Sequence, residues 1–217
     1  MNVPWGDRPW NRVLVYGLGA SGLAATRLLR TRGVEVMGVD LRDSSELDLA
    51  GLADDPGVEL VLGGELVDLP EGIDGVVMSP GVPLDRPLVQ AARSSGLPVV
   101  AEVELAFQSA PGPVVGITGS NGKSTTTLMT GEILAGAGYE VEVCGNIGVP
   151  LAAVVDGAAD RVFVTELSSF QLESVDTFRP RAAALLNLST DHLDRHRDER
   201  SYAAAKMRIF ENQVADD

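Results

Sequence analysis

The chain has 217 residues, and its 17 basic and 31 acidic side chains give a formal net charge of −14. This length corresponds to one or two domains of ~150 residues. The acidic balance excludes a broad surface for nucleic acid or anionic membranes, because such surfaces need clustered Lys and Arg. A single cysteine, Cys144, excludes an internal disulfide and a cysteine zinc cage, which favours a cytoplasmic location. No apolar run approaches the ~20 residues of a membrane span.

The first half of the chain alternates short β-branched runs with Ala- and Leu-rich stretches. The expected strands are residues 13–16, 34–39, 58–62, 73–78 and 98–100. A helix follows the first strand, since Ala24, Ala25, Leu28 and Leu29 recur at helical spacing. This alternation is typical of βαβ units and predicts one open parallel sheet.

Two prolines and a glycine within residues 109–113 interrupt the pattern, because they continue neither a helix nor a strand. Beyond them we expect strands at 114–118, 141–144, 162–165 and 182–188, and helices at 123–135 and about 202–211. The sequence therefore predicts two α/β domains, residues 1–110 and 111–217. Because the chain stops on a helix that should deliver a further strand, we expect the second domain to be incomplete.

The sharpest motif is Gly-Ile-Thr-Gly-Ser-Asn-Gly-Lys-Ser at residues 116–124, between a predicted strand and a predicted helix. Glycines let backbone N–H groups surround phosphate oxygens, Lys123 can reach terminal phosphates, and the Ser124 hydroxyl can hold Mg²⁺. Ile117 stands where the generic pattern has glycine. The alternative is a tight turn that binds nothing, but the Gly-Lys-Ser ending favours phosphate binding.

Lysine is rare in this chain, which has 15 arginines but only Lys123 and Lys206. Retention of an amine indicates a role that a guanidinium cannot take. An ammonium is a compact charge for phosphates, and a neutral amine can be carbamylated or act as a base. For Lys206, placement by chance remains an equal alternative.

A second glycine-rich turn follows the first predicted strand, with Gly17, Gly19 and Gly22. Asp40 ends the next strand, 18 residues after Gly22, and completes the spacing of a dinucleotide fingerprint. Residues 79–81 follow another strand at the same sheet edge. A nucleotide is expected there, but other nucleotides use the same geometry, so its identity stays open.

Titratable residues also follow strands of the second predicted sheet. Glu166 lies where a carboxylate can hold Mg²⁺ beside a phosphate loop, or it is an acid in the first turn of a helix. His192 and His196 lie in a charged run that is either a solvated face or a ligand site. Nothing in the sequence completes a zinc site around them, and His192 is the better candidate for a metal or phosphate ligand.

Together these segments resemble the Mur ligase family, and most closely its D-glutamate-adding members. The resemblance rests on residues 17–22, 79–81, 118–124, 145–148, 166–171, 187–196 and 205–206. The string Glu-Leu-Ser-Ser-Phe-Gln-Leu at 166–172 is the most diagnostic. The family implies a Rossmann-like, parallel-sheet N-terminal domain followed by a P-loop-type α/β central domain.

The resemblance implies that the first domain binds the UDP of a substrate rather than NAD. It assigns Ala20 and Ser21 to the diphosphate, Asp40 and Arg42 to the uracil, and Ser79, Pro80 and Gly81 to the ribose and phosphates. Leu41 stands where related enzymes often carry a hydroxyl residue.

The resemblance also implies an ATP site in the second domain. It assigns the ATP phosphates to the glycine-rich loop and the start of the next helix, that is, to Gly119, Ser120, Asn121, Gly122, Lys123, Ser124 and Thr125. It assigns the muramoyl substrate to Asn146, Ser168 and Gln171. One Mg²⁺ would bind Ser124 and Glu166, and a second Mg²⁺ would bind His192 and a carbamylated Lys206. Lys123, Glu166, His192 and Lys206 would form the catalytic set.

The implied reaction joins D-glutamate to UDP-N-acetylmuramoyl-L-alanine through an acyl phosphate made with ATP, in peptidoglycan precursor synthesis. Phosphoryl transfer between anions has a largely electrostatic barrier, which Mg²⁺ and Lys123 would lower. Family members are about twice this length, so we expect this chain to bind UDP compounds but to ligate poorly. Expected partners are these small molecules alone, with neither nucleic acid nor membrane, and a cytoplasmic monomer is expected.

Two other functions fit parts of the sequence. An NAD-dependent oxidoreductase would account for the three glycines of the first turn and Asp40. A nucleotide-binding module without turnover would account for both glycine-rich turns.

Overall fold

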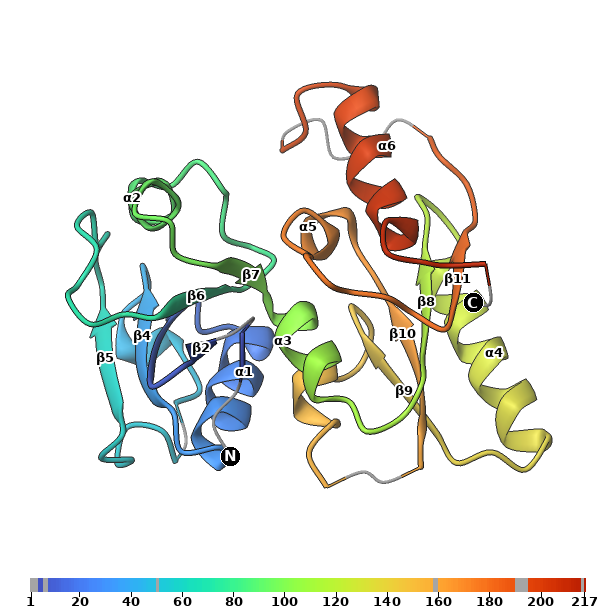
Figure 1. The fold of residues 1–217 in the computed structure, drawn as a ribbon, viewed down its shortest axis with the longest axis horizontal. Coiled ribbons are helices and arrows are strands. Elements are labelled where there is room, and N and C mark those ends of the chain that lie inside the picture. The colour runs from blue at the N-terminus through green and yellow to red at the C-terminus, as the bar shows by residue number, and fades with distance from the viewer. Residues whose placement is uncertain (1–3, 6–7, 50, 158–159, 190–194, 216) are drawn as a thin grey trace. The chain divides into compact units, whose positions relative to one another are not determined.

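The computed structural model describes residues 4–5, 8–49, 51–157, 160–189, 195–215 and 217. The chain forms two compact units, Met1–Glu102 and Val103–Asp217. Each unit contains its own parallel sheet, as Figure 1 shows. No helix within the described ranges is long and apolar enough to cross a bilayer.

The first unit contains a five-stranded sheet in the order β5-β4-β3-β6-β7, with every pair parallel. Its strands are β3 (Arg12–Tyr16), β4 (Glu35–Asp40), β5 (Val58–Leu62), β6 (Gly75–Met78) and β7 (Val99–Ala101). A short antiparallel pair, β1 (Pro4–Trp5) and β2 (Arg8–Pro9), precedes them. The strand order reverses between β3 and β6, and open α/β sheets bind ligands at such a switch point.

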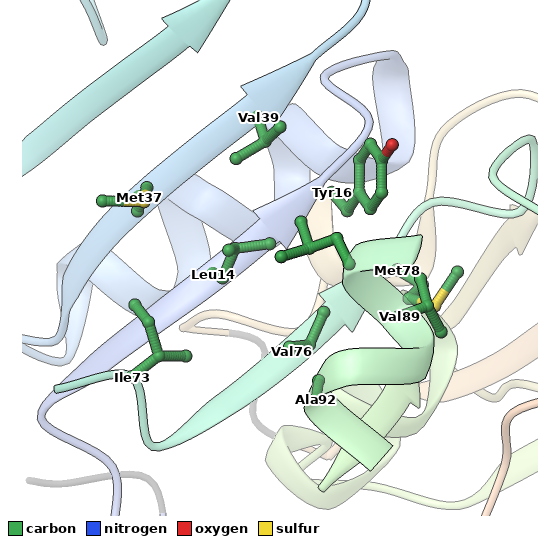
Figure 2. Close-up of a cluster of buried hydrophobic side chains, with 10 residues drawn as sticks. Leu14, Tyr16, Met37, Val39, Ile73, Val76, Met78, Val89 and Ala92 are labelled. Carbon is green, nitrogen blue, oxygen red and sulfur yellow. The ribbon is translucent and has the colours of Figure 1, made fainter. Parts of the chain in front are cut away.

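Two helices, α1 (Ala20–Thr31) and α2 (Pro87–Ser94), cover opposite faces of this sheet (Figures 1 and 2). A short 3-10 helix, η1 (Ser44–Glu46), follows β4. Because successive strand residues point to opposite faces, Leu14 and Tyr16 of β3 pack in the core on the α2 side, among Met37, Val39, Ile73, Val76, Met78, Leu88, Val89 and Ala92. Residues 13–16 are all at most 1% exposed, so β3 is buried on both faces as predicted.

The second unit contains a four-stranded parallel sheet in the order β11-β8-β10-β9. The strands are β8 (Val114–Thr118), β9 (Val141–Gly145), β10 (Val162–Glu166) and β11 (Ala182–Leu185). The helices are α3 (Glu102–Ser109), α4 (Lys123–Gly136), α5 (Ser169–Leu172) and α6 (Glu199–Met207), with short 3-10 turns η2 (Leu151–Ala153) and η3 (Arg208–Phe210). Leu134 of α4 packs against the core around Ile117 and Val164, whereas Gly116 lies against Leu167 and Ile209.

The predicted α/β class and strand positions are confirmed, but some element limits differ. Helix α6 begins at Glu199, earlier than predicted, because the Asp198 carboxylate caps it by accepting the Ser201 N–H at 2.7 Å. Strand β11 ends at Leu185 rather than residue 188, since the following residues turn to bind the loop before α4. Helices α2, α3 and α5 are not among the predicted helices.

Gly22 provides a test of the turn between β3 and α1. A Cβ at this position would overlap the carbonyl oxygen of Gly17 and lie 2.9 Å from the Ser79 Oγ. Gly22→Ala should therefore lower the free energy of unfolding by about 2–3 kcal/mol through overpacking. The measurement is urea unfolding followed by tryptophan fluorescence, since both tryptophans, Trp5 and Trp10, lie in the first unit.

Gly64→Ala, where a Cβ meets nothing within 4 Å, is the matched control. Equal stability of the two variants would contradict the packing argument.

Candidate functional site

A pocket of about 450 Å³ opens at the switch point of the first sheet. Its walls come from the ends of strands β3, β4 and β6 and from the loops that follow them. All seven residues predicted for the first unit line it, namely Ala20, Ser21, Asp40, Arg42, Ser79, Pro80 and Gly81. The remaining lining residues are Tyr16, Gly17, Gly19, Leu41, Val82, Pro83 and Arg86. The structure thus brings one complete set of predicted residues into a single cavity.

Asp40 anchors the glycine-rich turn. Its carboxylate accepts the Leu18 N–H at 2.6 Å and three donors of Arg42: the backbone N–H at 2.9 Å, Nε at 3.0 Å and a terminal nitrogen at 2.8 Å. A carboxylate has about four acceptor positions, so these four donors occupy it. The dinucleotide fingerprint would need this carboxylate for ribose hydroxyls, whereas here Arg42 is the group presented to the pocket.

The same contacts determine the charge of Asp40. Burial raises the pKa of Asp40, but the hydrogen bonds from Arg42 and from the Leu18 N–H outweigh burial and lower the pKa to about 2. Asp40 is therefore ionised near neutral pH and holds Arg42 at the pocket wall.

In the second unit, the predicted phosphate loop connects β8 to α4. Gly122 adopts φ +83°, a left-handed conformation that favours glycine, and α4 begins at Lys123. The Lys123 Nζ donates to the Ser120 carbonyl oxygen at 2.9 Å, so the ammonium lies within the loop. Thr125 is exposed on the first turn of α4.

Asn187 holds this loop from outside. Its side-chain oxygen accepts the Asn121 N–H and its side-chain nitrogen donates to the Asn121 carbonyl oxygen, both at 2.9 Å. The Ser120 N–H donates to the Asn187 carbonyl oxygen at 3.0 Å. Asn187 had no predicted role, although it begins one of the segments, 187–196, that carry the family resemblance.

Three predicted residues meet beside the loop at the carboxyl ends of β9 and β10. Glu166 is 2% exposed, and its two oxygens accept the Ser124 Oγ–H at 2.7 Å and the Asn146 side-chain N–H at 2.8 Å. Oxygen donors of this kind suit Mg²⁺. Among the described residues, no three His, Cys, Asp or Glu side chains form a metal cluster, so a cation here would need phosphate or water oxygens in addition.

Lys206 is also buried near the loop. It is 1% exposed, and its Nζ lies 3.4 Å from the Thr118 Oγ1 and 4.8 Å from the centre of the Tyr202 ring. The Tyr202 hydroxyl is 2.9 Å from the Ser120 Oγ. Tyr202, which belongs to no motif of the sequence, thereby connects the Lys206 amine to the phosphate loop.

Four further residues of the sequence analysis are His192, Ser168, Gln171 and His196. His192 lies outside the described residues. Ser168 and Gln171 cap α5 reciprocally, since the Ser168 N–H donates to the Gln171 side-chain oxygen at 2.9 Å and the Gln171 N–H donates to the Ser168 Oγ at 3.3 Å. His196 is 5% exposed and its Nε2 is 2.9 Å from the Ser169 Oγ, so the solvated-face alternative is wrong for this histidine.

Two models of known domain families match the chain. Residues 11–101 match the Mur ligase MurD-like N-terminal domain, and residues 117–217 match the Mur ligase middle domain. The chain belongs to the Mur ligase family.

Two curated relatives illustrate the similarity. Over 213 residues the chain is 46% identical to the UDP-N-acetylmuramoylalanine-D-glutamate ligase of Alkaliphilus metalliredigens. This alignment covers 95% of this chain and 46% of the relative. Over 204 residues the chain is 47% identical to the ligase of the same name from Koribacter versatilis, and this alignment covers 93% of this chain and 45% of the relative. The chain therefore spans about half the length of the curated relatives it matches.

Solved Mur ligase structures share the fold. The UDP-N-acetylmuramate:L-alanyl-gamma-D-glutamyl-meso-diaminopimelate ligase from Neisseria meningitides aligns with a TM-score of 0.58 at 19% identity, over 95% of this chain and 69% of the other. UDP-N-acetylmuramate-alanine ligase from Thermotoga maritima aligns with a TM-score of 0.54 at 20% identity, over 93% and 47%. Both alignments support the α/β architecture of this Mur ligase chain.

The low pKa of Asp40 predicts a pH-dependent contribution to stability. A carboxylate with a lowered pKa stabilises the folded chain above its unfolded pKa near 4, and this contribution is lost as the pH falls towards 2. Asp40→Asn should therefore cost about 2 kcal/mol of unfolding free energy at pH 7. The gap from the unchanged chain should close between about pH 4 and pH 2.

Urea unfolding across this pH range, followed by tryptophan fluorescence, measures the gap. The control is Asp68→Asn, because Asp68 is an exposed carboxylate of the same unit. A gap for Asp40→Asn that stays constant down to pH 2 would contradict the assignment.

Proposed function

We propose that this Mur ligase chain binds UDP-N-acetylmuramoyl-L-alanine in its first unit and ATP in its second. Within the whole protein, these sites serve the ATP-dependent addition of D-glutamate through an acyl phosphate. The observation that carries the proposal is the single cavity formed by all seven residues expected to bind the UDP group. The curated relatives support the choice of substrate, since they are named for this reaction.

The pocket of the first unit has the charge pattern that a diphosphate requires. Helix α1 begins at Ala20 on the pocket wall, and the N-terminus of a helix offers free N–H groups and a partial positive charge to anions. Arg42, with its side chain 46% exposed, adds a cation in a chain whose net charge is −14. Because the Asp40 oxygens already accept four donors, Arg42 rather than Asp40 is the charged side chain on this wall that can contact a ligand.

The second unit would hold the triphosphate of ATP in the β8–α4 loop. The Lys123 ammonium would exchange the Ser120 carbonyl for phosphate oxygens, and the first turn of α4 would face the same anion. Ser124 and Glu166 supply oxygen donors of the type that Mg²⁺ prefers. When bound, the ion would neutralise phosphate charge. Asn146 orients the Glu166 carboxylate, and Asn187 holds the loop backbone in place.

Lys206 is proposed to be carbamylated. The ammonium would first lose a proton to solvent, and the neutral amine nitrogen would then attack CO₂ and release a second proton, which replaces a cation by an anionic carbamate with oxygen ligands. Two observations support this role: a buried ammonium is costly, and the chain uses arginine at nearly every other basic position. The carbamate and His192 would hold a second Mg²⁺.

The remaining assignments follow the same scheme. Lys123 would stabilise negative charge that develops as the substrate carboxylate takes the γ-phosphate, and the amine of D-glutamate would then displace phosphate to form the amide. Asn146, Ser168 and Gln171 would contact the muramoyl part. The partners are small molecules rather than nucleic acid or membranes, and we place the chain in the cytoplasm as a monomer.

A thermal melt distinguishes this proposal from an NAD-dependent oxidoreductase. UDP should raise the unfolding midpoint because it binds the native state, and at a concentration of 100 times its Kd it adds about 2.7 kcal/mol. NAD at the same concentration should leave the midpoint unchanged. Stabilisation by NAD alone would overturn the assignment of the first unit, and a chain unaffected by either ligand would count against it.

Lys206 allows a second test in the whole protein. Lys206→Arg should abolish phosphate release from ATP in the presence of UDP-N-acetylmuramoyl-L-alanine and D-glutamate, because a guanidinium cannot form the carbamate. Short carboxylic acids should partly restore activity to Lys206→Ala by supplying the missing oxygens. Arg200→Lys, an exposed change in the same helix, is the control. Normal turnover by Lys206→Arg would refute the carbamate.

A further inference from the structure

Tyr16 has a polar atom that the fold leaves without a protein partner. The residue is 1% exposed at the end of β3, and within the described part of the chain its buried hydroxyl oxygen has no hydrogen-bond partner. A buried hydroxyl without a partner costs about 1–3 kcal/mol. Native proteins satisfy most such groups, so an exception needs an explanation.

The position of Tyr16 explains why its hydroxyl has no protein partner, because the residue lines the pocket at the switch point. In Figure 2 its hydroxyl lies at the end of β3, beyond the apolar cluster formed with Leu14 and Val39. Tyr16 belongs to the cluster on the α2 side of the sheet, whereas Ala20 at the start of α1 lies on the other side. The pocket therefore has polar groups from both faces of the sheet.

The surroundings of this hydroxyl favour an uncharged ligand group. On the same wall Arg86, which directly precedes α2, forms an ion pair with Glu65 at 3.2 Å, so the two charges balance. Burial raises the pKa of Tyr16, and the Glu65 carboxylate raises it further, so the hydroxyl keeps its proton and can donate. A neutral oxygen acceptor fits this setting better than a phosphate.

We propose that the Tyr16 hydroxyl donates a hydrogen bond to an uncharged oxygen in the nucleoside part of the bound nucleotide, which makes Tyr16 a specificity-determining residue. This inference rests on the proposed function, in which the pocket takes UDP and α1 faces its diphosphate. The candidate oxygens are the ribose hydroxyls and the carbonyls of the base. Nothing in the motif spacing of the chain indicated this residue.

Tyr16→Phe tests the inference, because it keeps the packed ring and removes the hydroxyl alone. Titration calorimetry should show UDP binding 3- to 10-fold weaker, as expected for one neutral hydrogen bond. Without ligand, the thermal midpoint should stay equal or rise, because the variant no longer buries an unsatisfied group. Tyr139→Phe, which changes a tyrosine 58% exposed in the second unit, should leave UDP affinity unchanged.

A second ligand, 2′-deoxy-UDP, locates the acceptor. If 2′-deoxy-UDP binds Tyr16→Phe and the unchanged chain with equal affinity, the acceptor is the ribose 2′-hydroxyl. If Tyr16→Phe loses the same affinity for UDP and for 2′-deoxy-UDP, the acceptor is another nucleoside oxygen. Undiminished UDP affinity in Tyr16→Phe overturns the inference and leaves the UDP site intact. A lower midpoint without ligand would also overturn it, because the hydroxyl would already be satisfied. Failure of the unchanged chain to bind UDP would reject the proposed function itself.

Discussion

The constraint on which both sites depend is the reversal of the backbone from a buried strand into a helix at the carboxyl edge of a parallel sheet. In the first unit, Gly22 lies so close to the carbonyl of Gly17 that a Cβ has no room. In the second, Gly122 adopts a left-handed conformation one residue before α4. Each reversal directs the N–H groups of a first helical turn away from the core, where an anion can reach them.

Both turns are held by polar side chains from neighbouring strand ends. The Ser79 hydroxyl donates to the Gly17 carbonyl at 2.7 Å, and the Asp40 carboxylate accepts the next N–H, that of Leu18. In the second unit, Asn187 brackets Asn121 through both atoms of its amide. In each case the supporting residue comes from a different strand than the turn, so the shape of the turn depends on correct sheet assembly. Such support limits how far the turn can relax, which is the preorganisation that phosphate binding requires.

The extent to which the sequence predicted this structure depends on which residues carry a local signal. The strands at residues 58–62 and 114–118 coincide with β5 and β8, because short apolar runs bounded by turn residues are typical of strands in an alternating α/β sequence. The position of the pocket at the edge of the first sheet followed from motif spacing, whereas the assignment of Ala20, Ser21 and Arg42 came from the family resemblance. Tyr16 and Tyr202 were missed, because a tyrosine in an apolar run or a helix has no motif, and its role depends on what packs beside its hydroxyl. The burial of His196 was missed for a similar reason, since Ser169 and Phe170 reach it from a distant part of the sequence.

The near absence of lysine has a practical consequence for handling this protein. Lys206 is 1% exposed, and Lys123 is half-buried at the first residue of α4, directly after the phosphate loop. Reagents that couple to primary amines, such as succinimidyl esters, therefore find few lysine side chains to modify on the folded chain, and the more accessible of the two lysines lies directly after the nucleotide loop. Immobilisation or dye labelling through amines would block that loop, whereas the extent of Lys123 labelling with and without nucleotide would report directly on its occupancy.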